Sequence, residues 1–289
     1  MWFHLFILPQ RKFAARSVTL SKIGLQRLSG KMELKLSGKT ALVTGSYRGT
    51  GLIIAKTLID EGVNVFVHGL DIDQANSAVS MLGSGIPVSG NIDSQDGCDE
   101  LLNQCSNRGI SILINNYGGA DSGSWEASNS QDWLEAYEKN VLSAQRITQG
   151  LLPDLLNQTV GRIITIGTIG TSRPNSIMPA YYSAKGALAT MTMSLAKKMS
   201  GTGVRVNLIS PGMILTDEVK DSLLKKAKKS GESEDWESVE SAAAKHLPTR
   251  KIATREEVAA IVAFLCSDYS RSIHGQNIKV DGGQLEVLM

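Results

Sequence analysis

The segment PAYYSAK, residues 179–185, places two adjacent tyrosines shortly before a lysine. If the segment is helical, Tyr181 and Lys185 stand four residues apart and share one helix face, whereas Tyr182 points away from it. A free phenol has a pKa of about 10, and a neighbouring ammonium group lowers that pKa because the cation favours the phenolate. The pair therefore predicts an acid/base device, in which Tyr181 exchanges a proton and Lys185 tunes its pKa. The alternative interpretation is a surface pair without chemical use.

A second candidate is the glycine-containing stretch TGSYRGTG, residues 44–51. Gly45, Gly49 and Gly51 permit a tight turn and a close approach of the backbone to a diphosphate. The diphosphate would lie at the N-terminus of the following helix, where free N–H groups and the helix dipole favour anions. The stretch therefore predicts a nucleotide-binding loop, with an ordinary strand-to-helix turn as the alternative.

From residue 39 onward, short β-branched runs alternate with longer amphipathic segments. Most of the runs are continuously apolar, as expected of strands covered on both faces. Such alternation predicts βαβ units and therefore an α/β fold, with a doubly wound parallel sheet and helices on both faces. No linker or internal repeat interrupts residues 35–289, which predicts one domain. The expected strands are 40–45, 63–69, 86–90, 111–116, 162–167, 204–210 and 276–282, and the helical segments include 49–61, 132–150, 181–200 and 255–267.

The first 31 residues differ in charge from the rest of the 289-residue chain. They carry six basic and no acidic side chains, so residues 32–289 hold 24 basic against 28 acidic residues, a net charge of −4. A mildly acidic body argues against nucleic acid as a partner, because binding to phosphates requires a clustered basic surface. The apolar run 2–8 is too short to span a membrane. Residues 1–34 are interpreted as an N-terminal extension, either an organelle transit peptide or the product of a start assigned upstream of Met32.

Neither the cysteines nor the histidines are spaced as metal ligands. Cys98, Cys105 and Cys266 form no C-x-x-C pair, which argues against a zinc site or a disulfide framework and favours a reducing compartment. The four histidines are scattered and form no H-E-x-x-H motif. We therefore predict no metal site and a cytoplasmic location, with mitochondria or another organelle as the alternative if the extension is a transit peptide.

Several motifs follow one another in a fixed order along residues 35–289. Together they resemble the short-chain dehydrogenase/reductase family, specifically members similar to 3-oxoacyl-[acyl-carrier-protein] reductases. The resemblance implies a single-domain Rossmann fold with a seven-stranded sheet, a nicotinamide dinucleotide, and hydride transfer between a carbonyl and a secondary alcohol. The motifs are TGSYRGTG, NNYG at 115–118, Asn140 in EKNVLS, GRIITIGT at 161–168, YYSAK, RVNLISPG at 205–212 and the closing VDGG at 280–283.

The resemblance also implies roles for individual residues. It makes Tyr181 the catalytic acid, while Lys185 holds the nicotinamide ribose hydroxyls and Asn140 holds a water that continues the proton relay. The residues expected to bind the cofactor are Gly45, Tyr47, Arg48, Gly49, Thr50, Gly51, Gly69, Asn91, Ile92, Asn116, Tyr117, Gly118, Tyr181, Lys185, Pro211, Gly212, Ile214 and Thr216.

Two positions depart from the family pattern. Thr168 stands thirteen residues before Tyr181, where the family usually has a serine that hydrogen-bonds the substrate oxygen. A threonine keeps the hydroxyl, but its methyl group stiffens the side chain, so Ser172 is the second candidate for this role. Tyr117 replaces the usual alanine of the N-N-A-G motif. Its ring either reshapes the cofactor site or simply packs, and packing is favoured.

The choice between NAD and NADP depends on the residue at the end of the second strand. An acidic residue there would bind the ribose 2′-hydroxyl of NAD. That position is Gly69, and Leu70 follows where the family usually has an arginine. Arg48 in the glycine loop then becomes the donor to a 2′-phosphate, opposed by the nearby Asp71. The sequence therefore favours NADP(H), with NAD(H) as the alternative.

The substrate is not specified by these motifs. Segment 213–250 is rich in lysine and glutamate and predicts a mobile helical lid, which suits a larger or acyl-type substrate. A 3-oxoacyl thioester reductase therefore competes with a sugar, polyol or steroid dehydrogenase. A non-catalytic dinucleotide-binding scaffold or sensor is the alternative from another class. The partners expected are a small carbonyl or alcohol, no nucleic acid, no membrane, and further copies of the chain in a homotetramer or homodimer.

Overall fold

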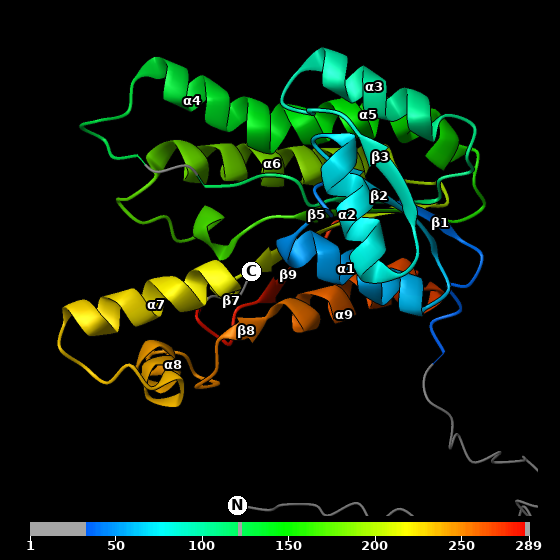
Figure 1. The fold of residues 1–289 in the computed structure, drawn as a ribbon. Coiled ribbons are helices and arrows are strands. Elements are labelled where there is room, and N and C mark those ends of the chain that lie inside the picture. The colour runs from blue at the N-terminus through cyan, green and yellow to red at the C-terminus, as the bar shows by residue number, and fades with distance from the viewer. Residues whose placement is uncertain (1–32, 121–122, 287–289) are drawn as a thin grey trace, which may run out of the picture. The chain divides into compact units, whose positions relative to one another are not determined.

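Seven parallel strands form one sheet in the computed structural model of the protein, which describes residues 33–120 and 123–286 (Figure 1). The strand order is β3-β2-β1-β4-β5-β6-β9, and every neighbouring pair is parallel. This confirms the predicted α/β fold with a doubly wound seven-stranded sheet. The strands are β1 (Thr40–Val43), β2 (Asn64–Gly69), β3 (Ile86–Ser89), β4 (Ile112–Asn115), β5 (Gly161–Ile166), β6 (Val204–Pro211) and β9 (Asn277–Val280).

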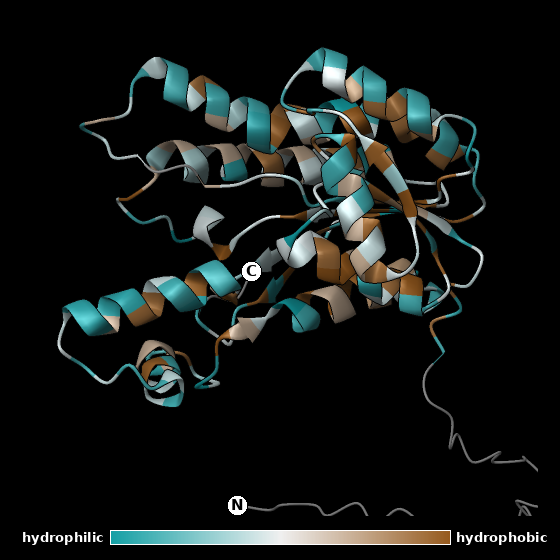
Figure 2. Cartoon of the chain, in the orientation of Figure 1, coloured by the Kyte–Doolittle hydropathy of each residue, from teal (hydrophilic) through white to brown (hydrophobic). Residues whose placement is uncertain are grey.

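Helices cover both faces of this sheet. Helices α1, α2 and α9 pack on one face, and α3, α5 and α6 pack on the other. Figure 2 shows hydrophobic residues concentrated on the strands and on the helix surfaces that meet them. The helices are α1 (Gly49–Asp60), α2 (Ile72–Leu82), α3 (Gln95–Cys105), α4 (Ser130–Tyr137), α5 (Ser143–Leu156), α6 (Pro179–Lys198), α7 (Asp217–Lys229), α8 (Trp236–Ala244) and α9 (Arg255–Cys266).

The strands are buried because helices cover them from both sides. All four residues of β4 and all six of β5 are buried, which explains why their sequences, ILIN and GRIITI, are mostly apolar rather than alternating. One core contains Ile54 of α1 and Val262 of α9, and the other contains Leu101 of α3 and Leu151 of α5. The two cores fix the sheet between its helical layers.

The strand order reverses at β1, which pairs with β2 on one side and β4 on the other. At the carboxyl ends of β1 and β4, the chain turns away in opposite directions. This divergence opens a crevice above the two strands. The predicted loop 44–51 follows β1 directly, and residues 116–119 follow β4. The topology therefore brings both segments to the same crevice.

Segment 213–250 contains two helices, α7 and α8, together with the short strand β7 (Ile214–Leu215), which pairs with β8 (Ala253–Thr254). Figure 1 shows α7 and α8 in yellow and orange beside β7 and β8. They have a small apolar core of their own, around Leu247 and Ile252. The Lys220 ammonium also lies 4.9 Å from the Trp236 ring centroid. The helices predicted for segment 213–250 are present. That they form a mobile lid stays a prediction.

Other expectations meet the structure only in part. Residues 1–32 lie outside the described residues, so the interpretation of the extension stays a prediction. Within 33–120 and 123–286, no helix has the length and apolar character needed to cross a membrane, and no metal-binding group of acidic, His and Cys side chains occurs. All three cysteines are buried and unpaired. Self-association also stays a prediction, although α4 leaves Leu134 and Tyr137 exposed.

We predict that the first turn of α1 tolerates no side chain at Gly51, because a methyl group there would collide with the Gly45 carbonyl and the Asn116 amide. Gly51→Ala should lower the free energy of unfolding by about 1–3 kcal/mol, as overpacking does. The matched control is Gly186→Ala in α6, where a methyl group would meet nothing within 4 Å. That change should stabilise the protein by about 0.5–1 kcal/mol, because alanine suits a helix better than glycine. Urea unfolding followed by circular dichroism measures the free energy of unfolding of both variants. An equal change in that free energy for the two variants would contradict the proposed close contact.

Candidate functional site

A cavity of about 520 Å³ lies at the carboxyl ends of β1, β4 and β5. Its walls come from the loop after β1, the start of α1, the segments after β4 and β5, and the start of α6. Its lining residues are Gly45, Tyr47, Arg48, Gly49, Thr50, Gly51, Leu70, Asn116, Tyr117, Gly118, Gly119, Ala120, Lys139, Ile166, Gly167, Thr168, Tyr181, Lys185, Pro211, Gly212 and Ile214.

Side chains of Thr44 and Asn116 tie the loop after β1 to the end of β4. The Thr44 hydroxyl accepts hydrogen bonds from the backbone N–H groups of Asn116 and Tyr117, each at 3.0 Å. In return the Asn116 side-chain amide donates to the carbonyls of Thr44, at 2.9 Å, and Gly45, at 3.2 Å. Because these groups are largely withdrawn from water, the bonds fix the two loops against each other.

The N-terminus of α1 opens into this cavity without a side-chain cap. Arg48 occupies the N-cap position but its side chain makes no capping hydrogen bond, and the first turn contains no acidic residue. By contrast, α2 and α3 are capped by Asp71 and Ser94. The uncapped N–H groups of the first turn therefore present partial positive charge to the cavity.

The same turn also leaves space for a ligand. A methyl group added to Gly49 would meet nothing within 4 Å, and its φ of +59° is one that favours glycine. The space in front of Gly49 and the uncapped N–H groups fit the diphosphate of a dinucleotide.

The buried side chain of His68 is hydrogen-bonded to the loop after β1. Its Nδ1 atom accepts a hydrogen bond from the Gly45 N–H at 2.9 Å, so Nε2 carries the proton and donates to the Gly90 carbonyl, also at 2.9 Å. Burial lowers the pKa of this imidazole to about 4, although the bond to Gly90 opposes the shift. His68 is therefore neutral in the folded protein and joins the loop after β1 to the loop after β3.

Gly69 does not face the cavity. A side chain at this position would collide with the start of α2, since an added Cβ would stand 2.7 Å from the Ala75 backbone nitrogen. Leu70 lines the cavity instead, and Asp71 accepts a hydrogen bond from the Gln74 N–H at 2.8 Å as the cap of α2. The described lining contains the cations Arg48, Lys139 and Lys185 but no carboxylate. This charge balance favours an anionic ligand.

Tyr181 and Thr168 meet at the inner end of the cavity. Thr168 follows β5 and Tyr181 lies in the first turn of α6, and both residues line the cavity. Tyr182 points elsewhere: it is not part of the described lining, and its hydroxyl accepts a hydrogen bond from the Asn175 side chain at 3.0 Å. Ser172 is also absent from the described lining. The structure therefore brings together the tyrosine and the threonine that the sequence singled out first.

The pKa of Tyr181 moves in the opposite direction from the sequence expectation. Burial raises it to about 12, the neighbouring Tyr182 adds to the shift, and the hydrogen bond from Thr168 opposes it. Lys185 is also buried, and burial lowers the pKa of its ammonium to about 8. Its Nζ donates to the Ile166 carbonyl at 3.1 Å. In the protein alone, desolvation is thus the largest cause of the shift in each pKa.

Asn140 lies behind the cavity wall rather than in it. Its Oδ1 accepts from the Gly119 N–H at 3.1 Å, and its Nδ2 donates to the Gly119 and Ala136 carbonyls, each at 3.0 Å. It belongs to a π-helical turn, Glu138–Leu142, between α4 and α5. A side chain at Gly118 would stand 2.7 Å from Asn140 Oδ1 and 3.2 Å from Lys185 Nζ. Asn140 therefore holds the loop after β4 close to Lys185.

Tyr117 packs between two loops and also lines the cavity. Its hydroxyl donates to Asp93 Oδ2 at 3.0 Å, and its ring meets the edge of His68 at a centroid distance of 6.3 Å. The ring also lies close to Gly45, where an added Cβ would stand 3.1 Å from the Tyr117 Cα. The packing interpretation favoured from the sequence agrees with these contacts.

Four of the residues expected to bind the cofactor lie outside the described lining. Gly69 packs on α2, Thr216 caps α7, Asn91 is exposed and Ile92 is buried in the core. Sequence reasoning missed Leu70, Gly119, Ala120, Lys139, Ile166 and Gly167, which line the cavity. Each lies within or close to a residue or motif that the sequence analysis identified. Proximity in the sequence to those motifs was therefore the signal that could have found them.

Comparisons with known proteins show what the chain is similar to. Residues 45–284 match a family described as enoyl-(acyl carrier protein) reductase. An uncharacterized oxidoreductase of Bacillus subtilis, YvaG, is 31% identical over 262 residues, covering 87% of this chain and 98% of that protein. The 3-oxoacyl-[acyl-carrier-protein] reductase FabG of Aquifex aeolicus is 31% identical over 259 residues, covering 87% and 99%.

A solved structure is similar over nearly the same length. L-Sorbose reductase from Gluconobacter frateurii, described as complexed with NADPH and L-sorbose, superimposes with a TM-score of 0.81 at 30% identity. The match covers 89% of this chain and 100% of that one. The likeness therefore extends over most of this chain.

We predict that His68 makes stability fall as the pH drops from 6.5 towards 4. The folded protein holds this imidazole with a pKa of about 4, whereas the unfolded chain has the ordinary value of 6.5 and binds the proton first. The loss should be on the order of 3 kcal/mol across that window. Urea unfolding at several pH values measures it, and His68→Gln should remove this part of the pH dependence.

The control for that measurement is His246→Gln, because His246 is exposed and lies outside the cavity. It should leave the pH dependence of stability unchanged. A His68→Gln profile that is parallel to the wild-type profile would contradict the assignment of a buried neutral imidazole.

Proposed function

The chain belongs to the short-chain dehydrogenase/reductase family of NAD(P)-dependent oxidoreductases, and we propose that it is an NADP(H)-preferring reductase that interconverts a carbonyl and a secondary alcohol. One observation carries the proposal: a single cavity is lined by Tyr181, Thr168 and the buried Lys185 and reaches an uncapped helix N-terminus. No carboxylate belongs to the described lining, which suits a ligand that bears several phosphates.

Tyr181 is the proposed acid/base. Because its pKa is raised to about 12, the phenol keeps its proton at neutral pH and can donate it from Oη to a substrate oxygen. The Thr168 hydroxyl, which opposes the rise in the pKa of the phenol, offers a second donor to the same oxygen. The nicotinamide group, when bound, supplies the hydride. Neither proton donor requires a metal.

Lys185 and the glycine loop are proposed to hold the dinucleotide. The described residues give the Lys185 ammonium one hydrogen bond, to Ile166, so its other N–H groups need acceptors that ribose hydroxyls would provide. The backbone of Gly49–Gly51 would receive the diphosphate. A ribose bound to Lys185 would also hold the positive charge close to Tyr181 and ease the return of the proton in the oxidative direction. Asn140 has the role of positioning the loop that lines this region.

Preference for NADP(H) is proposed from the adenosine side of the cavity. Leu70 and Arg48 line this part of the wall, and the carboxylate of Asp71 caps α2. The Arg48 guanidinium lies 5.3 Å from the Tyr47 ring centroid, which supports it by a cation–π contact. Arg48 would then donate charge-assisted hydrogen bonds to a 2′-phosphate.

Two substrate classes are supported by different relatives. The similarity to 3-oxoacyl-[acyl-carrier-protein] reductases supports a 3-oxoacyl thioester, and the helices α7 and α8 suit a substrate with an acyl chain. The similarity to L-sorbose reductase, at 30% identity, supports a ketose as the second candidate. Both classes present a ketone to the same pair of proton donors, so the catalytic roles are the same in each.

We predict that the purified protein oxidises NADPH in the presence of an acetoacetyl thioester or L-sorbose, followed at the nicotinamide absorbance. Tyr181→Phe should lower kcat by about 10²- to 10⁴-fold, the contribution of a positioned general acid. Tyr182→Phe is the matched control and should be nearly as active as wild type, because its hydroxyl faces Asn175. NADPH binding without turnover on any ketone would favour the non-catalytic sensor instead.

Variants at Thr168 separate the role of its hydroxyl from that of its shape. Thr168→Val keeps the shape but removes the hydroxyl, so kcat should fall by about 10²- to 10³-fold while NADPH affinity stays nearly unchanged. Thr168→Ser should retain much of the activity because the hydroxyl remains. Full activity of Thr168→Val together with an inactive Ser172→Ala would reassign the hydroxyl to Ser172.

We predict that Arg48→Ala weakens NADPH binding by about 1.5–3 kcal/mol, the value of a charged hydrogen bond, and changes NADH binding much less. Fluorescence titration of the two reduced cofactors measures the difference directly. Arg108→Ala is the control, because Arg108 is exposed and lies outside the described lining. Equal losses for both cofactors would reject Arg48 as the 2′-phosphate donor.

A further inference from the structure

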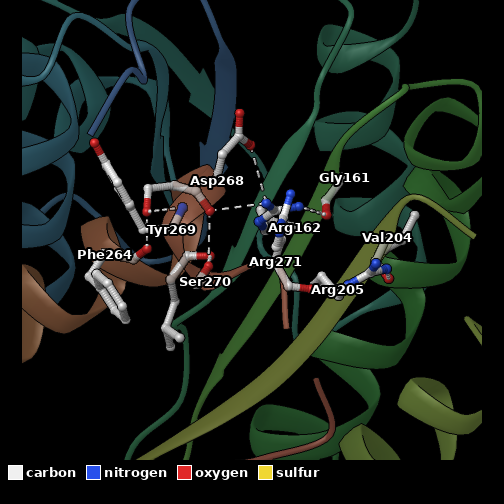
Figure 3. Close-up of polar contacts among 11 residues, drawn as sticks. Gly161, Arg162, Val204, Arg205, Phe264, Asp268, Tyr269, Ser270 and Arg271 are labelled. Atoms are coloured by element: carbon white, nitrogen blue, oxygen red, sulfur yellow. Dashed lines mark hydrogen bonds and ion pairs between the residues drawn. The ribbon is translucent and has the colours of Figure 1, made fainter. Parts of the chain in front are cut away.

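A second cavity, of about 590 Å³, lies at the opposite ends of the strands, where β5 and β6 begin. Arg162 is the second residue of β5 and Arg205 the second of β6, whereas the catalytic cavity lies beyond the last residues of the same sheet. Figure 3 shows these arginines close to the 3₁₀ turn η3 (Asp268–Ser270) and Arg271. The lining residues are Leu34, Lys35, Thr159, Val160, Arg162, Gly203, Arg205, Asp268, Tyr269 and Arg271.

Arg162 is a buried cation with incomplete compensation. It is 3% exposed, and its Nη atoms donate to the carbonyls of Gly161 and Ser267, each at 3.0 Å. The carboxylate nearest to it belongs to Asp268, at 3.5 Å, and that side chain is 62% exposed. Its Nε–H is buried without a hydrogen-bond partner. A buried charge is costly unless it is paired, so Arg162 favours a further anion in the cavity.

Two more arginines and a lysine add to this positive charge. Arg205 donates to backbone carbonyls only, through Nε to Arg271 at 2.7 Å and through Nη1 to Thr202 at 2.9 Å. The side chains of Arg271 and Lys35 are exposed and make no hydrogen bond or ion pair with a described residue. The described lining thus carries four cations against the single carboxylate of Asp268.

Structural roles explain only part of this arrangement. Arg162 satisfies the Ser267 carbonyl after the end of α9, and Arg205 ties the loop before β6 to Arg271. Neither role requires cations at positions 35 and 271, where no described residue forms a hydrogen bond or ion pair with the side chain. Residues 32–289 carry a net charge of −4, so a concentration of positive charge at one cavity runs against the overall composition. The surplus makes the cavity attractive to an anion.

The remaining walls are apolar or aromatic. Leu34 and Val160 are partly buried, and the Tyr269 ring is 55% exposed although it lines the cavity. Ligand cavities of a few hundred Å³ commonly combine such walls with a few charged groups that fix orientation. Arginine is suited to this role because its planar guanidinium binds carboxylates and phosphates through two donors.

We propose that this cavity binds a small organic anion, in which a phosphate or carboxylate group contacts Arg271, Arg205 and Lys35 and an aromatic or apolar body packs on Tyr269. The site is separate from the dinucleotide cavity, because the two share no lining residue and lie at opposite ends of β5. Arg162 stabilises the bound anion through its positive charge from beneath the site.

Phenyl phosphate is a suitable probe because it combines the two features. Isothermal titration calorimetry would be performed on the full chain with saturating NADP⁺, so that the dinucleotide cavity is occupied, and inorganic phosphate would be titrated in parallel. We expect saturable binding of one phenyl phosphate per chain, tighter than that of inorganic phosphate. Arg271→Gln should weaken phenyl phosphate binding by about tenfold or more, since it removes a charged donor. Lys35→Gln is a second charge variant and keeps the test valid if Arg271→Gln does not fold.

Tyr269→Ala tests the aromatic contact separately. It should weaken phenyl phosphate by about three- to tenfold and leave inorganic phosphate unchanged, because it removes apolar area without changing charge. The matched control is Arg108→Gln, which removes an exposed arginine outside the cavity and should not change binding.

Three results would overturn the proposal. One is the lack of saturable phenyl phosphate binding at about 1 mM, which corresponds to about −4 kcal/mol of binding free energy. Another is an equal loss in Arg271→Gln and Arg108→Gln, which would show only a general effect of charge. The third is equal affinity for inorganic phosphate and phenyl phosphate, which would show an adventitious ion only.

Discussion

The contact between the first turn of α1 and the loop after β1 is the constraint on which the cavity proposed to bind the dinucleotide depends. The Cα atom of Gly51 approaches the Gly45 carbonyl so closely that no side chain fits between them. Asn116 and Thr44 hold this arrangement by bonding each other's backbone across the β1–β4 boundary, and His68 supports Gly45 from below. Because these bonds are made by the protein itself, the uncapped helix end is preorganised to receive an anion rather than formed by one.

Desolvation decides the electrostatics of this site. The sequence expectation was that Lys185 lowers the pKa of Tyr181, but burial raises that pKa to about 12 and lowers the pKa of Lys185 to about 8. Both shifts have one cause, because a site closed to water penalises whichever form of each group is charged. The protein alone therefore holds Tyr181 as a proton donor. The second cavity, at the amino ends of β5 and β6, also holds a buried cation, Arg162, and Asp268 is the single carboxylate of its described lining.

Much of the fold and part of the site followed from local patterns. Mostly apolar runs marked strands such as β4 and β5, because strands covered on both faces carry no regular polar alternation. The four-residue spacing in α6 correctly separated Tyr181, which lines the cavity, from Tyr182, which does not. The sequence also showed that the last residue of β2, Gly69, carries no carboxylate, and the described lining of the cavity contains none. These features depend on residue type and on spacing along one element, so the sequence alone determined them.

Tertiary structure decided what depends on distant segments and on burial. Asn140 reaches the site through the loop after β4 rather than directly, and Lys139 and Leu70 enter the cavity only because their elements converge there. The direction of the Tyr181 pKa shift also required the packed structure, since desolvation is a property of the surroundings and not of a spacing. Arg162 gave no signal in the sequence, where it reads as an ordinary strand residue. Its significance arises from β6 and η3, which enclose it together with charges that are far apart in the chain.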